Sequence, residues 1–231
     1  MKAAYVYNID EIPHEEDCLL GVVININRGW HKQRHCGIAF NLHGELRVLH
    51  LATHNVVQCD REFNGFICWV KPEMHSSLQQ AFCAYLEFIG DTVENGNNDK
   101  IPYGFLYDEY ARIDTDGKLY LGGKECGLTC ATFVLTLFAS KGFRLIDLET
   151  WLPRDEDRSW FFQILAYFKG SVVRNKMSIS HFKRIFSEIG CPRFRPEEIA
   201  VSSALYNKGA AKTEDIRQAG GELLDYLFEI T

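Results

Sequence analysis

The stretch HCGIAFNLHGELRVLHLA, residues 35–52, constrains the fold of this chain more than any other part of the sequence. Two runs rich in apolar and β-branched residues flank the dipeptide His43-Gly44. A two-residue hairpin turn needs positive φ at both central positions, which glycine adopts freely and histidine tolerates better than most residues. We therefore predict an antiparallel β-hairpin whose turn is centred on His43-Gly44.

The register of this hairpin decides whether two of its histidines can act together. A two-residue turn places Gly37 opposite His50 and His35 opposite Ala52, so His35 and His50 share one face as diagonal neighbours. Gly37 has no side chain and leaves space beside the His50 ring. A three-residue loop would shift the register by one residue and move the two rings to opposite faces. The alternative, two edge-strand histidines with structural hydrogen bonds, stays open.

The other polar residues around the hairpin have simpler interpretations. We interpret His31, His43 and His54 as loop or turn residues. His31, His35 and Cys36 are a conceivable zinc set, but Cys36 points to the opposite face of a strand from His35. We therefore predict no metal and no other cofactor, and we take Cys36 to be a bystander.

A second group of residues lies about eighty residues later, in GLTCATFVLTLF (127–138). Thr129 is a suitable N-cap, and apolar residues follow Cys130 at helical spacing, so Cys130 begins the buried face of a helix. The positive end of the helix dipole favours a thiolate there, and the first-turn amide of Cys130 can bind an oxyanion. Cys130 is thus the candidate nucleophile. A buried structural cysteine is the alternative, and Cys126 is a weaker rival.

The residues around this cysteine offer candidate binding groups. Tyr103 and Tyr107, in the segment YGFLYDEY, can supply a further oxyanion donor or line a substrate cleft. Thr129 lies beside the nucleophile and is a third candidate for the same role. Packing in an aromatic core is the alternative for the two tyrosines.

Strands precede helices along the chain, which indicates an α+β fold. We expect a core domain over residues 1–150 and a helical extension over 151–231, packed on the core and possibly part of the same domain. The acidic run RDEDR (154–158) is interpreted as a solvated helix start. The expected elements are strands over 18–27 and 66–70, a helix from Ser76 or Ser77 to Gly90, a helix from Cys130 to Gly142, and helices over 156–169, 178–189, 196–206 and 213–229.

Composition and charge exclude several functional classes. The chain has 231 residues and a net charge of −6, so it has no basic field for nucleic acid. It lacks a signal-peptide run and any stretch near the roughly 18 apolar residues of a membrane span. We expect a cytoplasmic protein without an integral membrane segment; delivery as an effector is compatible with this, and the oligomeric state is left open. Without a secretory signal, its eight cysteines are expected to be thiols rather than disulfides.

The motifs RHCGIAF…GELRVLHLA and TCATFVLTLF together resemble the permuted papain-like enzymes of the NlpC-type superfamily, and among them the lecithin:retinol acyltransferase-like branch. The resemblance covers residues 30–52 and 123–140. It implies a circularly permuted papain-like fold, with an antiparallel sheet packed on the helix that bears the nucleophile. It also implies that Cys130 is the nucleophile, His35 the general base and His50 the third, orienting residue. Where the acyltransferase branch has N-C-E-H-F, this chain has TCATF.

The sequence therefore predicts a thiol-dependent hydrolase, similar to amidases and peptidases. It would cleave an amide or ester bond through a Cys-His-His triad and a thioester acyl-enzyme, on a peptide, acyl or small amide substrate. Three alternatives remain open: an acyltransferase or phospholipase-like enzyme of the same fold, a catalytically inactive binding module, and a zinc-binding interaction protein.

Overall fold

The computed structural model has an α+β fold, as the order of elements along the sequence predicts. It describes residues 5–12, 18–27, 33–63, 65–98, 100–120, 127–206 and 209–230. The strands are β1 (Val6–Asn8), β2 (Cys18–Asn27), β3 (Gln33–Leu42), β4 (Glu45–Thr53), β5 (Val56–Asp60), β6 (Phe66–Val70), β7 (Arg112–Ile113) and β8 (Leu119–Tyr120). The α-helices are α1 (Ser76–Glu94), α2 (Cys130–Ser140), α3 (Arg158–Val173), α4 (Ile179–Ser187), α5 (Pro196–Ala204) and α6 (Thr213–Ile230).

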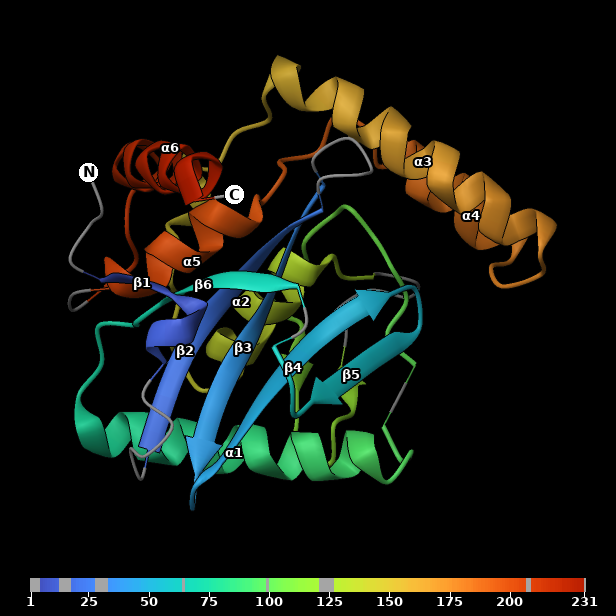
Figure 1. The fold of residues 1–231 in the computed structure, drawn as a ribbon. Coiled ribbons are helices and arrows are strands. Elements are labelled where there is room, and N and C mark those ends of the chain that lie inside the picture. The colour runs from blue at the N-terminus through green and yellow to red at the C-terminus, as the bar shows by residue number, and fades with distance from the viewer. Residues whose placement is uncertain are drawn as a thin grey trace.

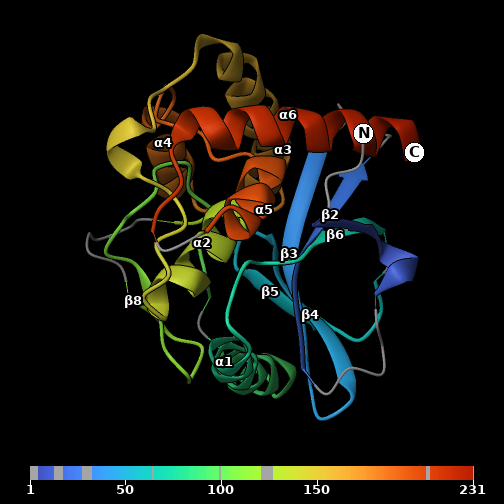
Figure 2. The ribbon, with the colours of Figure 1, turned by 90° about the vertical axis from the view of Figure 1, so that its left-hand side faces the viewer.

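One six-stranded antiparallel sheet organises the molecule, with strand order β1-β6-β2-β3-β4-β5. Helices α1, α2 and α5 pack against the same side of this sheet (Figures 1 and 2). The main hydrophobic cluster fills the space between them and includes Phe40 of β3, Phe82 of α1, Phe138 of α2 and Ile199 of α5. A smaller cluster around Trp69 and Val48 covers the opposite side. Both sides of the central strands are therefore buried.

The β3–β4 hairpin forms with the predicted turn and register. His43 and Gly44 have φ of 72° and 89°, as a two-residue turn requires. Strand pairing runs without a register shift from Leu42–Glu45 to Ile38–Leu49. A turn that the local sequence specifies therefore sets the register of β3 and β4.

Helix α1 departs from its expected limits at both ends. His75, rather than a serine, is its N-cap, because Nδ1 of His75 accepts a hydrogen bond from the amide of Ser77. Gly90 does not end the helix, which continues to Glu94. A Cβ at Gly90 would lie 2.9 Å from Sγ of Cys59, so this glycine serves the close approach of α1 to β5. Strand β5 itself was not predicted.

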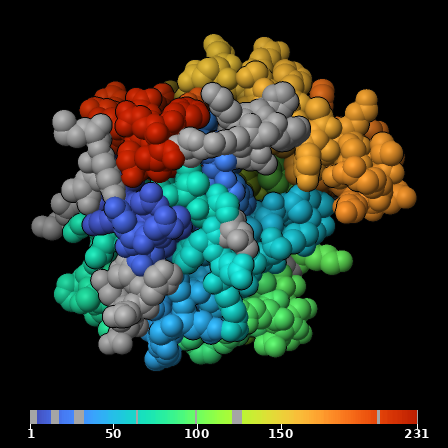
Figure 3. Space-filling view, in the orientation of Figure 1, coloured from blue at the N-terminus to red at the C-terminus, as the bar shows by residue number. Residues whose placement is uncertain are grey.

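The C-terminal helices divide between two packing clusters. Helices α5 and α6 contribute to the main cluster, on the side of the sheet that α1 and α2 cover. Helices α3 and α4 pack on each other around Phe161, Phe168 and Ile185, and this cluster also contains Phe105. The α3–α4 pair protrudes from one corner of the molecule, beside the end of β4 (Figures 1 and 3). Within the described residues, no helix combines the length and the apolar character that a bilayer crossing needs.

The interpretation of RDEDR as a solvated helix start is wrong for Asp157, which is only 1% exposed. Its carboxylate forms ion pairs of 2.9 Å with each of Arg154, Arg193 and Arg195. Burial alone would raise the pKa of Asp157, but the three guanidinium groups outweigh it and leave that pKa lowered. Two of the arginines come from a distant segment, so the sequence run by itself does not reveal this buried network.

Candidate active site

The candidate site lies where β3 and β4 separate, beyond the last pair of their ladder, Ile38–Leu49. Nε2 of His35 lies 2.8 Å from Nδ1 of His50, and the two rings meet edge to face. A Cβ at Gly37 would lie 2.8 Å from Cβ of His50, so this position needs glycine. The predicted proximity of His35 and His50, and the space that Gly37 leaves, are both confirmed.

Helix α2 brings Cys130 to the same place. Thr129 is its N-cap: the hydroxyl of Thr129 accepts a hydrogen bond from the amide of Thr132, as predicted. Cys130 is the first residue of the helix, is partly exposed, and lines a cleft together with His35, whose pKa its sulfur raises. Because Nε2 of His35 faces His50, its Nδ1 is the ring nitrogen left for the sulfur. The structure thus brings together Cys130, His35 and His50.

Cys36 is the largest single influence on the pKa of Cys130, which its interpretation as a bystander did not anticipate. It does lie on the other face of β3 from His35, in the main cluster, whereas His35 contacts Phe66 of the smaller cluster. The N-terminus of α2, however, packs on the side of Cys36, so that Cys36 and His35 both lower the pKa of Cys130. Alternation along β3 predicts that His35 and Cys36 lie on opposite faces of the sheet. It does not predict on which face α2 begins.

These contacts set the charge state of the site. The hydrogen bond from the Cys36 thiol, followed by the charge and hydrogen bond of His35, outweighs burial and holds the pKa of Cys130 well below its ordinary value. Burial alone would lower the pKa of His35, but the Cys130 thiolate reverses this and raises it. Burial lowers the pKa of His50 despite its hydrogen bond with Asp60. The arrangement therefore favours a thiolate and an imidazolium, with neutral His50 behind them.

Asp60 is a site residue that sequence reasoning missed. Its Oδ2 accepts a hydrogen bond of 2.9 Å from Nε2 of His50. His50 is only 7% exposed, and both of its ring nitrogens have hydrogen-bond partners. Asp60 is the last residue of β5, and only recognition of that strand could have signalled it.

A cleft of about 320 Å³ opens in front of Cys130 and His35. Residues of β4 and α3, together with Tyr103, form a largely apolar wall, whereas the ends of β2 and β3 contribute polar groups. The wall includes Leu51, Tyr103, Ile164, Tyr167 and Phe168, and the polar groups are Asn25, Gln33 and Arg34. Helix α3 thus forms one side of the cleft that Cys130 lines.

The backbone of Tyr103 is held in this cleft from two sides. Its amide donates to Nδ1 of His54 at 3.1 Å, and its carbonyl accepts from Nε2 of His181 at 2.8 Å. The next residue, Gly104, crosses Gly127 so closely that a Cβ on Gly127 would lie 2.6 Å from the Gly104 nitrogen. Tyr103 therefore lies beside the nucleophile in a fixed position.

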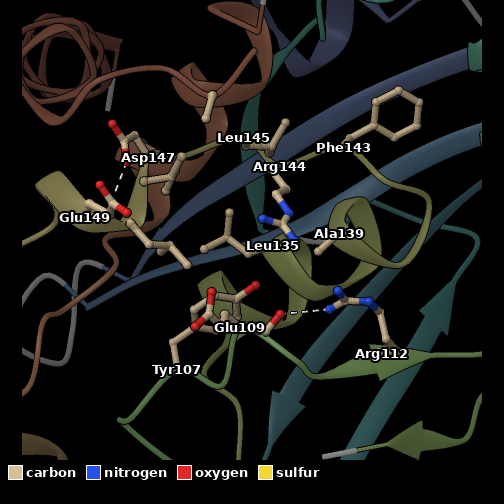
Figure 4. Close-up of a pocket in the computed structure, with 13 residues that line it drawn as sticks. Tyr107, Glu109, Arg112, Leu135, Ala139, Phe143, Arg144, Leu145, Asp147 and Glu149 are labelled. Atoms are coloured by element: carbon tan, nitrogen blue, oxygen red, sulfur yellow. Dashed lines mark hydrogen bonds between the residues drawn. The ribbon is translucent and has the colours of Figure 1, made fainter. Parts of the chain in front are cut away.

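The structure places Tyr107 and the side chain of Thr129 away from the cleft. Tyr107 lines a second cavity of about 240 Å³, together with Glu109, Arg112 and Asp147 (Figure 4). Burial raises the pKa of the Tyr107 hydroxyl to about 12. The hydroxyl of Thr129 is taken up by the cap of α2. Tyr107 is therefore not beside Cys130, and Thr129 serves the nucleophile by fixing the start of its helix.

The other candidates of the sequence are His31, Cys126 and the remaining cysteines. His31 and Cys126 lie outside the described residues. The seven cysteines of the described part are free thiols, and no group of three or more potential metal ligands occurs there.

No family model matches the chain, and no curated protein or solved structure matches it either. The assignment of a function therefore rests on the geometry of Cys130, His35 and His50.

Proposed function

We propose that the protein is a thiol-dependent hydrolase that cleaves an amide or ester bond. One arrangement carries the proposal: Cys130 begins a helix and lines a cleft together with His35, and His35 in turn contacts His50. A nucleophile, a base and a group that orients the base are the three parts that covalent catalysis by a thiol requires. Six other cysteines of the described chain lack such a set.

The reaction would proceed through a thioester. His35 holds the proton of Cys130, and the thiolate attacks the carbonyl carbon of the substrate. His35 then donates this proton to the leaving amine or alcohol, and a thioester of Cys130 remains. Water loses a proton to His35 as it attacks the thioester, and the Cys130 thiolate leaves. An alcohol or amine in place of water would make the same enzyme an acyltransferase.

The developing oxyanion would lie at the N-terminus of α2. First-turn amides of a helix have no acceptor within the helix, and the positive end of the helix dipole favours negative charge. The amide of Cys130 is the first donor, and the hydroxyl of Tyr103, in the wall of the cleft, is the candidate for the second.

A permuted papain-like fold is the architecture that best accommodates this proposal. An antiparallel sheet packs on the helix that carries the nucleophile, and the two histidines precede the cysteine along the chain. The cleft suits a substrate with an apolar group beside its carbonyl, since Leu51, Ile164 and Phe168 face it. A peptide, an acyl chain or a small amide fits this description.

The test is the rate at which each of the eight cysteines reacts with iodoacetamide at pH 6, read by peptide mass spectrometry. Cys130 should react at least about 100-fold faster than the others, because only a thiolate reacts rapidly. His35→Ala should remove this advantage, whereas His43→Asn, at an exposed turn, should not. With p-nitrophenyl acetate as a model ester, Cys130 should become acetylated. Equal reactivity of all the cysteines would refute the proposal.

A further inference from the structure

We propose that Asp60 is a positioning residue of this site, which acts through His50 to determine the nitrogen of His35 that carries a proton. The proposal rests on the function proposed above for Cys130 and His35. It is carried by three observations: a break in the register of β4 and β5, the 2.9 Å hydrogen bond between Asp60 and His50, and the burial of His50.

The break in register puts Asp60 on the same face as His50. Next to the turn, Thr53 pairs with Val56, but beyond a bulge at Ala52 the pairing shifts by one residue. Asp60 therefore lies opposite Val48, diagonal to His50, whose own partner is Gln58. Without the bulge, Asp60 would lie opposite Leu49 and its side chain would be on the other face of the sheet. The irregularity thus places a carboxylate against the imidazole.

The hydrogen bonds then fix the tautomer of each ring in turn. A carboxylate only accepts hydrogen bonds, so Nε2 of His50 must carry the proton that Asp60 accepts. Neutral His50 consequently has an unprotonated Nδ1, which accepts from Nε2–H of His35. With its Nε2 protonated, His35 has only Nδ1 with which to take the proton of Cys130. One carboxylate thus determines which nitrogen of each imidazole donates and which accepts.

The reversed tautomer explains what the loss of Asp60 would do. If Nδ1 of His50 carried the proton, it would donate to Nε2 of His35. Neutral His35 would then carry its own proton on Nδ1, facing the sulfur, and could not accept another. Because the Asp60 side chain is 44% exposed, solvent screens its charge, and the hydrogen bond rather than the charge should carry most of the effect.

The primary test reads the tautomers directly. The Cys130→Ala protein, in which no thiolate holds His35 protonated, is labelled with ¹⁵N-histidine and examined by long-range ¹H–¹⁵N NMR at pH 8, with the signals assigned from the His35→Gln and His50→Gln variants. With Asp60 in place this protein should show a single Nε2–H tautomer of His50, and the Asp60 variants are made in the same background. Asp60→Ala should show a substantial share of the Nδ1–H tautomer, whereas Asp60→Asn, whose amide oxygen still accepts, should keep the single Nε2–H form. A single Nε2–H tautomer in Asp60→Ala would overturn the proposal.

The second test measures the consequence at the sulfur. Alkylation of Cys130 by iodoacetamide at pH 6 should slow about tenfold in Asp60→Ala, in the range seen when a partner behind a first ligand or base is removed. Asp60→Asn should retain most of the rate, and Asp225→Ala, an exposed acid of α6, should change nothing. Equal losses in Asp60→Ala and Asp60→Asn would mean that charge matters rather than the tautomer, which also overturns the proposal. If wild-type Cys130 reacts slowly, the proposed function fails, and the NMR test still decides the role of Asp60.

Discussion

Two pairs of histidines in the described part of the chain differ in what lies at their outer ends. The ring centroids of His35 and His50 are 4.9 Å apart, and those of His54 and His181 are 4.7 Å apart. The first pair joins the Cys130 sulfur to the Asp60 carboxylate. The second pair holds the backbone amide and carbonyl of one residue, Tyr103.

The contrast shows that proximity of two imidazoles does not by itself make one of them a base. Burial, followed by the nearby charge of His181, lowers the pKa of His54 to about 4. Burial acts on His35 in the same direction, yet its pKa is raised because the Cys130 thiolate lies beside it. We therefore infer that the thiolate distinguishes a reactive pair, His35 and His50, from a structural pair, His54 and His181.

The largest expected effect comes from removal of that thiolate. In Cys130→Ala, burial of His35 is no longer opposed, so its pKa should change from above the ordinary value of an imidazole to below it. His35 would then resemble His54. NMR titration of the His35 ring in the wild type and in Cys130→Ala measures this change.

A matched control for this experiment is Cys83→Ala. Cys83 is also buried in the main cluster, but burial raises its pKa, so it carries no charge near neutral pH. The titration of His35 should be the same in Cys83→Ala as in the wild type. A raised pKa of His35 that survives in Cys130→Ala would show that another group is responsible.

The second effect compares the two pairs at equivalent positions. His50→Gln should slow alkylation of Cys130 at pH 6 about tenfold, because His35 loses the partner that orients it. His54→Gln should leave this rate within about twofold, since His54 hydrogen-bonds with the Tyr103 amide and packs against Phe168 rather than against Cys130 or His35. Similar losses in both variants would contradict the division into a reactive and a structural pair.

The features that the sequence predicts are those set by local rules. The turn at His43-Gly44 follows from positive φ, and the proximity of His35 and His50 follows from that turn. The start of α2 follows from the cap at Thr129. The general α+β architecture follows from strands that precede helices.

The features that the sequence does not predict depend on one-residue shifts or on distant segments. Asp60 reaches His50 only because of a bulge at Ala52, for which no local signal stands out. Cys36 reaches Cys130 because α2 begins on its side of the sheet, which alternation along β3 does not specify. The second histidine of the structural pair, His181, lies far along the chain in α4, so nothing near His54 indicates it.

The smallest expected effect is the pH dependence that His54 gives to folding stability. Its pKa is about 4 in the folded protein and near 6.5 when unfolded, so its stabilising effect is complete above about pH 6.5 and decreases as the pH falls towards 4. Burial is the main cause of the lowered pKa, followed by the charge of His181. Protonation would also remove the acceptor, Nδ1 of His54, that the Tyr103 amide uses. Because the ring is partly exposed, we discount the effect to about 1 kcal/mol, which is roughly 2–4 °C in Tm for a chain of this size.

Thermal unfolding of the wild type and of His54→Gln at pH 7 and at pH 4.5 measures this effect. Between pH 7 and pH 4.5 the Tm of the wild type should fall by more than the Tm of the variant, because glutamine does not titrate.

His35→Gln should show the opposite pH dependence. Its raised pKa makes His35 a group whose stabilising effect is present at low pH and lost as the pH rises through that pKa, so its removal should reduce stability most on the acidic side. If the contributions of these two histidines to Tm change in opposite directions with pH, the contrast between the pairs is established by thermodynamics alone, without any assay of the sulfur. If the contribution of His35 decreases towards low pH as that of His54 does, His35 is held neutral in the folded protein. The thiolate–imidazolium pair at Cys130 would then have to be abandoned.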